Sequence, residues 1–196
     1  MSLEAVIERP GPIEVETIVA ADWQVPLAGL LNLDHPEAER AGLEDRDEPI
    51  KVFFHAIRHP EHGLFIIDSG IERALTESPK DAAIRGLAAK VLRVESMKVH
   101  TDTATWLEAR GEPLRGVLLT HLHLDHVSGL PDVPRGTPIF VGPGETESKG
   151  FENLAVRPVF NRALDEHAAL QQWRFVKDPD GRFEGVVDVF GDGSLW

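Results

Sequence analysis

The chain has 196 residues, and its 20 Lys and Arg against 33 Asp and Glu give a formal net charge of −13. A chain of this length buries roughly two thirds of its unfolded surface, so it can fold without disulfides. Because the sequence has no cysteine, thiolate catalysis, iron–sulfur clusters and sulfur-ligated zinc sites are excluded. The acidic balance opposes binding to nucleic acid or to an anionic membrane, since both attract Lys and Arg.

No stretch of the sequence predicts export or membrane insertion. No apolar run approaches the roughly 20 residues of a membrane span. Residues 1–10 lack the basic-then-apolar order of a secretion signal. We therefore expect a cytoplasmic protein with no membrane partner and no nucleic-acid partner.

The N-terminal part of the chain predicts strands separated by a long loop. Residues 11–20 alternate apolar and polar side chains, which is typical of a strand. Residues 21–49 contain Pro36 and a run of charges, and they predict a loop with at most a short helix. Residues 50–57 and 64–68 predict a hairpin whose second strand is nearly all apolar, so we expect both of its faces to be covered.

Two helices are predicted in the middle of the chain. Residues 79–95 place apolar side chains at helical spacing, and we expect this stripe to pack on the protein's own core. Basic residues in the same stretch leave a partner surface as the alternative. Residues 101–109 predict a shorter helix with Thr101 or Thr103 as its N-cap and Gly111 beyond its end.

The rest of the chain predicts short strands and ends abruptly. Residues 116–120, 137–141 and 186–190 have strand-like composition, and residues 191–194 (Gly-Asp-Gly-Ser) predict a hairpin turn. Only Leu-Trp follows that turn, which is too short for a returning strand. We therefore expect a single domain over 1–196 that is incomplete at its C-terminus, with a genuine terminus as the alternative.

Three imidazoles and a carboxylate fall within six residues, directly after a predicted buried strand: His121, His123, Asp125 and His126. In an extended segment, His121 and His123 point to the same side. If the chain then turns into a helix, Asp125 and His126 project to another point of the same rim. Such donors suit Zn²⁺, and also Fe²⁺ or Mn²⁺. Packed together without a metal they would be costly to desolvate and would repel one another when protonated, so the cluster predicts a metal site.

The other histidines have no partner at ligand spacing. We interpret five of them as ordinary core or surface residues: His35, His59, His62, His100 and His167. His55 lies within a predicted strand beside Phe54, and we interpret it as a core residue, with a position facing the site as the alternative.

The segment HLHLDH at residues 121–126 resembles the His-x-His-x-Asp-His signature of the metallo-beta-lactamase superfamily. Upstream, residues 65–70 (FIIDSG) resemble the family's strand that ends in Asp, a small residue and Gly. The resemblance spans roughly residues 11–196 and is closest to the lactonase-like and glyoxalase-II-like hydrolases. It implies an α/β fold, the αββα sandwich of two similar halves. Here we expect the N-terminal half plus the start of the second half.

The resemblance also implies roles for the site residues. His121 and His123 would bind a first zinc ion, and Asp125 and His126 a second. Asp68 would orient a ligand from behind, although a turn-initiating Asp is the alternative. The family's later ligands, a third His, a bridging Asp and a final His, are not found in this sequence. We therefore expect this chain alone to bind metal weakly or not at all.

The function that the resemblance implies is metal-dependent hydrolysis of a small ester, lactone or thioester by a metal-activated hydroxide. Asp125 would orient the nucleophile and pass a proton to the leaving group. The partner would be a small acyl substrate, and a homodimer or a separate C-terminal fragment stays open. One alternative is a persulfide-dioxygenase-like enzyme with a single Fe²⁺, and another is a non-catalytic half-domain completed by another chain. The charge of −13 opposes a nuclease.

Overall fold

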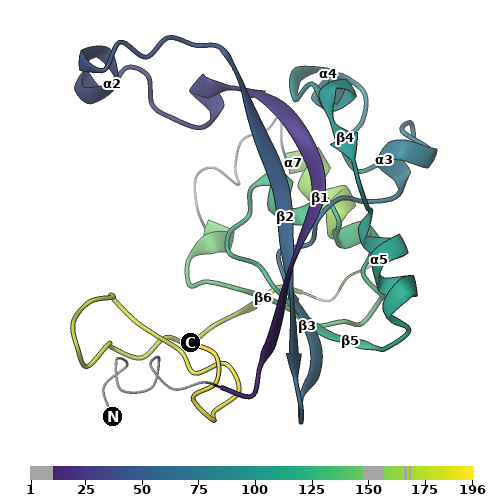
Figure 1. Ribbon diagram of the computed structural model, residues 1–196, viewed down its shortest axis with the longest axis vertical. Helices are drawn as coiled ribbons and strands as arrows, with labels where there is room; N and C mark the ends of the chain where they lie inside the picture. The colour runs from purple at the N-terminus through teal and green to yellow at the C-terminus, as the bar shows by residue number, and fades with distance from the viewer. Residues whose placement is uncertain (1–10, 148–156, 166, 168) are drawn as a thin grey trace.

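The computed structural model describes residues 11–147, 157–165, 167 and 169–196. Its centre is a mixed sheet of seven strands in the order β4-β1-β2-β3-β5-β6-β7 (Figure 1). The strands are β1 (Glu14–Pro26), β2 (Asp47–His59), β3 (Gly63–Ile67), β4 (Lys98–Val99), β5 (Leu114–Leu118), β6 (Ile139–Val141) and β7 (Gln171–Gln172).

Short helices fill the connections. The α-helices are α2 (Pro36–Arg40), α3 (Ala74–Glu77), α4 (Leu87–Val91), α5 (Thr103–Arg110), α6 (Leu124–Val127) and α7 (Arg157–Ala163). The 3-10 turns are η1 (Leu27–Gly29), η2 (Val94–Ser96), η3 (Leu130–Asp132) and η4 (Glu145–Glu147). In the described part of the chain, no helix has the length and apolar character needed to cross a membrane.

The direction of the strands changes across the sheet. β1 is antiparallel to both β4 and β2, and β2 is antiparallel to β3. β3, β5, β6 and β7 are mutually parallel. The carboxyl ends of parallel strands meet at one edge of a sheet, which is where ligands usually bind in such folds. The segments that follow β3 and β5 therefore meet at this edge.

β1 and β2 form a ribbon that extends beyond the end of β3. The β1–β2 pairing continues to Pro26 opposite Asp47, whereas the β2–β3 pairing stops at His55 opposite Ile67. Residues 21–26, which the sequence predicted as loop, therefore belong to β1. Buried apolar side chains alternate with polar ones in this part of the strand, and the Trp23 indole donates to the Leu92 carbonyl at 3.1 Å.

The main core lies between the sheet and the helices α3, α5, α6 and α7, whereas α4 has no buried residue. In Figure 1, α3, α4 and α5 lie to one side of the ribbon. The Trp106 ring of α5 meets the Phe54 ring of β2 edge-on, with centroids 5.2 Å apart. Fully buried aliphatic side chains from successive strands complete this layer: Ile66, Val117, Ile139 and Val141. The nearly all-apolar β3 is thus buried on this face, whereas Phe65 and Ile67 on its other face are only partly buried. The predicted cover of both faces is therefore confirmed for one face only.

The predicted helix over 79–95 is largely wrong. Only α4 and η2 are helical in this stretch, and Gly86 precedes α4 with a left-handed φ of 62°. The Ala83 N–H donates to the Glu72 carboxylate at 2.7 Å, so a side chain takes a bond that a helix would have used. The apolar side chains Leu87 and Val91 lie exposed, so the predicted stripe does not pack fully on the core.

The predicted helix over 101–109 is confirmed as α5, with a different cap. The Asp102 carboxylate accepts the Thr105 N–H at 2.7 Å, and Asp102 rather than a threonine is the N-cap. Gly111 ends the helix with a left-handed φ of 64°, as expected. Thr103 is buried instead, and its hydroxyl donates to the Ser69 carbonyl.

The predicted strand over 186–190 does not form. Val186 makes only an isolated antiparallel bridge with Val176. The predicted turn over 191–194 does form, because Val189 N–H donates to the Leu195 carbonyl at 2.9 Å. We use "C-terminal segment" for residues 174–196, drawn in yellow, which lies beside the start of β1 in Figure 1.

Candidate metal centre

The ends of β3 and β5 bring the predicted site residues to one place. Directly after β3, Asp68 takes a left-handed backbone with φ of 59°, and its N–H donates to the Leu118 carbonyl of β5 at 3.0 Å. Asp tolerates this conformation better than most residues. The N–H of Ser69 then donates to the His126 carbonyl at 2.9 Å. The turn after β3 therefore supports α6, which carries the second half of the motif.

The four residues of the motif lie together. The His121 ring centroid is 4.4 Å from that of His123 and 4.0 Å from that of His126. His126 Nε2 is 3.2 Å from the Asp125 carboxylate. The motif thus places three imidazoles and a carboxylate side by side, while their role as metal ligands stays a prediction.

Asp68 lies behind this group and is buried. Its Oδ2 accepts from His126 Nδ1 at 2.8 Å, and its Oδ1 accepts the Thr120 N–H at 2.9 Å. A carboxylate on the far nitrogen of an imidazole fixes the orientation of the ring, which is the usual arrangement behind a metal-binding histidine. Asp68 therefore has the conformation of a turn residue and also contacts His126, so the two predicted roles do not exclude each other.

The pKa values of two of the imidazoles, His126 and His121, are shifted in opposite directions. Burial lowers the pKa of His126, but the hydrogen bonds to Asp125 and Asp68 outweigh burial and raise this pKa to about 10. Burial and the nearby His126 and His123 hold the pKa of His121 below its usual range. Burial would raise the pKa of Asp125, yet its bond with His126 keeps that pKa below the ordinary value. His121 is thus a neutral imidazole next to an ionised Asp125–His126 pair.

The chemistry of the donors fits zinc, whereas their arrangement is not that of a formed site. Among the described residues, no group of three or more His, Asp or Glu side chains is placed to hold a metal ion. In addition, His126 uses both ring nitrogens on carboxylates, Asp68 on one side and Asp125 on the other. Binding a cation at Nε2 requires loss of the proton that Asp125 accepts.

Sequence reasoning missed one residue of this centre. Thr120 directly precedes the motif, and its hydroxyl contacts Asp68, His121 and His126. A hydroxyl next to a cluster of ligands was the available signal. A second missed contact comes from Glu145 of η4, whose carboxylate accepts the Leu122 N–H at 3.3 Å.

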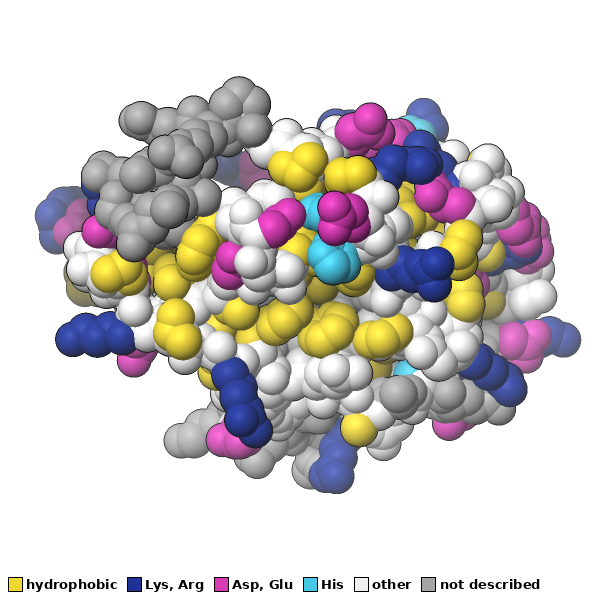
Figure 2. All heavy atoms as spheres, turned by 90° about the horizontal axis from the view of Figure 1, so that it is seen from below, with side chains coloured by type: hydrophobic (Ala, Val, Ile, Leu, Met, Phe, Trp, Pro, Cys, Tyr) yellow, Lys and Arg dark blue, Asp and Glu magenta, His cyan; other side chains and the backbone are white. Residues whose placement is uncertain are grey.

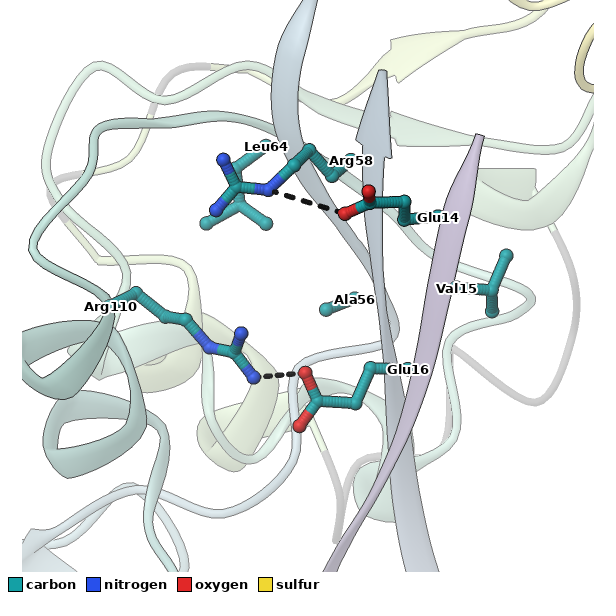
Figure 3. Close-up of a pocket in the computed structure, with 7 residues that line it drawn as sticks. All are labelled: Glu14, Val15, Glu16, Ala56, Arg58, Leu64 and Arg110. Carbon is teal, nitrogen blue, oxygen red and sulfur yellow. Dashed lines mark hydrogen bonds and ion pairs between the residues drawn. The ribbon is translucent and has the colours of Figure 1, made fainter. Parts of the chain in front are cut away.

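A pocket on the surface lies apart from the histidine cluster. Figure 2 shows histidine and acidic side chains next to a band of apolar side chains on one face. The pocket in Figure 3 lies at the start of β3, at the opposite end of that strand from Asp68, and pairs Glu16 with Arg110. It is lined by Glu14, Val15, Glu16, Ala56, Arg58, Leu64 and Arg110. The pocket and the histidine cluster are therefore distinct.

Comparison with known proteins decides the family. A family model described as the metallo-beta-lactamase superfamily matches residues 48–195. The chain belongs to the metallo-beta-lactamase superfamily. The resemblance found in HLHLDH and FIIDSG is thus confirmed, and the mixed α/β fold agrees with it.

Individual relatives of this metallo-beta-lactamase chain are distant. "Gamma-lactamase FDB1" of Fusarium pseudograminearum (strain CS3096) is 27% identical over 150 residues, which cover 69% of this chain and 33% of that protein. A solved quorum-quenching N-acyl homoserine lactone lactonase has a TM-score of 0.56 at 15% identity, covering 85% of this chain and 59% of its own. A probable metal-dependent hydrolase from Staphylococcus aureus has a TM-score of 0.55 at 14% identity, covering 87% and 62%.

These matches establish the fold, and they also show a difference in length. The chain spans about a third of the curated relative, of which 33% is covered. It spans under two thirds of the two solved structures, of which 59% and 62% are covered.

Proposed function

We propose that this metallo-beta-lactamase protein takes part in metal-dependent hydrolysis of a small cyclic or open acyl compound, a lactone, ester or thioester. The observation that carries the proposal is the gathering of His121, His123, Asp125 and His126 where β3 and β5 end. Support for a ring substrate comes from the relatives, one called a gamma-lactamase and another a lactone lactonase.

We propose that the metal is a pair of zinc ions. The residues that would hold them are His121, His123, Asp125 and His126. When bound, zinc supplies a Lewis acid and a water whose pKa is lowered toward neutrality. The Asp68 carboxylate keeps His126 Nδ1 protonated and so directs Nε2 away from itself. His121 is neutral at physiological pH because burial lowers its pKa, which leaves a lone pair free for ligation.

Asp125 is the residue that we assign to proton handling. Its pKa is held below the usual range, so the carboxylate is ionised at neutral pH and able to accept a proton. It already accepts the proton of His126 Nε2 at 3.2 Å. A carboxylate in this place would take a proton from the attacking water and deliver it to the leaving oxygen.

The test combines metal content with turnover. Because weak binding is expected, the purified chain is assayed with zinc in excess on a γ-lactone, a simple aryl ester and a thioester, and bound metal is measured by elemental analysis. We expect H121A and H123A to lower bound zinc, and D125N to reduce turnover by about 10³-fold. The matched control is H35A, since His35 caps the remote helix α2 through its contact with the Glu37 N–H.

Two results would contradict the proposal. Equal zinc content in H121A, H123A and wild type would reject the ligand assignment. Full zinc loading without hydrolysis of any of the three compound classes would reject the hydrolase, and a single bound iron in place of zinc would favour the persulfide-dioxygenase-like alternative.

A further inference from the structure

The hydroxyl of Thr120 is the meeting point of three functional side chains. Thr120 Oγ1 lies 2.9 and 3.1 Å from the two carboxylate oxygens of Asp68. It also lies 3.1 Å from His121 Nδ1 and 3.2 Å from His126 Nδ1. Thr120 is therefore in contact with both halves of the motif and with the carboxylate behind it.

Counting protons assigns a direction to each of these bonds. A hydroxyl has one proton to donate and two lone pairs that accept. The Asp68 carboxylate only accepts, so the Thr120 O–H donates to it. The lone pairs of Thr120 are then left for N–H donors. His126 Nδ1–H already donates to Asp68 Oδ2 at 2.8 Å, so the donor left for Thr120 is Nδ1 of His121, at 3.1 Å. His121 must therefore carry its proton on Nδ1.

We propose that Thr120 is a positioning residue that fixes the tautomer of His121. The hydrogen bond made by one imidazole nitrogen decides which nitrogen keeps the lone pair. With Nδ1–H donating to Thr120, the lone pair of His121 lies on Nε2. The same hydroxyl ties this ring to Asp68, so His121 and His126 take their orientation from one shared anchor. That the free Nε2 then serves a metal rests on the function proposed above.

The backbone of Thr120 allows a clean substitution. Its N–H donates independently to Asp68 Oδ1 at 2.9 Å, so the main chain keeps its anchor when the hydroxyl is removed. The side chain is exposed, so valine in its place overfills no core space. T120V therefore removes the hydroxyl at nearly constant shape, and T120S keeps the hydroxyl.

The experiment reads the tautomers directly in the metal-free chain. Two-bond ¹H–¹⁵N correlation spectra of the ¹⁵N-labelled protein identify which ring nitrogen of each histidine is protonated. We expect wild type and T120S to hold His121 with Nδ1–H, and T120V to shift it to Nε2–H. His59 is the internal control, because its Nδ1 accepts the Glu61 and His62 N–H groups and its tautomer must stay the same in all three proteins.

Zinc affinity gives a second readout. We expect T120V to bind zinc at least tenfold more weakly than wild type, and T120S to restore the affinity, which is the size of effect seen when a residue behind a ligand is lost. An unchanged His121 tautomer in T120V would overturn the proposal. If T120V does not fold, as judged from its amide spectrum, T120A decides by the same criterion. A shifted tautomer in a chain that binds no zinc would support the role of Thr120 and count against the proposed function.

Discussion

At the scale of single residues, Glu72 is the buried acid that the proposed chemistry does not use. The side chain is 2% exposed and its carboxylate accepts the Ala83 N–H at 2.7 Å. Burial raises its pKa from 4.5 to about 7, despite the opposing effect of the backbone N–H donors. A carboxyl with a raised pKa in the folded state stabilises the fold most when it is protonated.

We predict that Glu72 makes the protein less stable as the pH rises from about 4.5 to about 7. The folded state binds the proton more tightly than the unfolded state in this window, so its contribution is complete below the window and lost above it. The size is at most about 3 kcal/mol in the free energy of unfolding. Urea denaturation at pH 5 and pH 8 measures it, and E72Q should abolish most of the difference.

The control for this measurement is E77Q, since Glu77 is an exposed acid on the nearby helix α3. E77Q should keep the wild-type dependence on pH. If E72Q keeps it as well, the titration belongs to another group and the role of Glu72 is refuted.

The residues of the motif could be predicted from the sequence, whereas their supporting contacts could not. His121, His123, Asp125 and His126 are close in sequence, so local spacing alone brings their side chains together. Asp68 reaches His126 from another strand, and only the parallel pairing of β3 with β5 makes that contact. The family resemblance implied a role for Asp68, whereas the only sequence signal for Thr120 was its hydroxyl directly before the motif.

At the scale of elements, the predictions from local helix and strand propensity were wrong in two stretches of the chain. The stretch 79–95 has the apolar spacing of a helix. However, the Glu72 carboxylate accepts the Ala83 N–H, and Gly86 has a positive φ that an α-helix does not contain. β1 was underestimated because the loop-like composition of 21–49 hid the alternation in residues 21–26. The bond from Ala83 to Glu72 and the pairing of residues 21–26 with β2 join separate parts of the chain, which local propensity does not include.

Gly129 lies where three segments pack together: the turn after β3, helix α5 and the residues that follow α6. A Cβ at this position would lie 1.8 Å from the Ser69 carbonyl oxygen and 2.5 Å from Thr103 Oγ1. We predict that G129A destabilises the fold by about 3 kcal/mol, because backbone has to move to admit the methyl group. Chemical denaturation measures the loss.

Gly29 offers the matched comparison, since nothing lies within 4 Å of a Cβ built there. G29A should unfold at the wild-type midpoint within about 0.5 kcal/mol. A G129A protein as stable as G29A would show that this contact is not tight.

At the scale of the whole molecule, one buried histidine fastens the C-terminal segment to the sheet. His59 at the end of β2 is 3% exposed, and its Nε2 donates to the Asp192 carboxylate at 2.8 Å. The hydrogen bonds from Ser194 and His59 hold the pKa of Asp192 below its usual range. The attachment is therefore present above the ordinary pKa of Asp and is lost as the pH falls through the lowered value.

We predict that D192A loosens the C-terminal segment while leaving the sheet intact. Hydrogen–deuterium exchange followed by mass spectrometry should show faster exchange over 174–196 and unchanged exchange over β2 and β3. The control is E184A, a change at an exposed acid of the same segment. Equal exchange in D192A and wild type would mean that other contacts hold the segment.

The overall fold was predictable mainly through the motif and the strands around it. The structure contains the strands predicted over 50–57, 64–68, 116–120 and 137–141, with shifted ends. These strands were predictable because a short buried apolar run has few alternatives to a place in a sheet. The strand over 186–190 fails because a strand needs a neighbour, and Val186 pairs with its partner only once.

The four tryptophans occupy four different environments. Trp106 is buried beneath the Arg110 guanidinium, Trp173 stacks on Phe140 with ring centroids 4.5 Å apart, and Trp196 is 44% exposed. Trp23 is tied to the chain near η2. Intrinsic fluorescence therefore contains separate emission from the core, the ribbon, the parallel edge and the C-terminal segment, and single Trp→Phe replacements would resolve the opening of each region without an external dye.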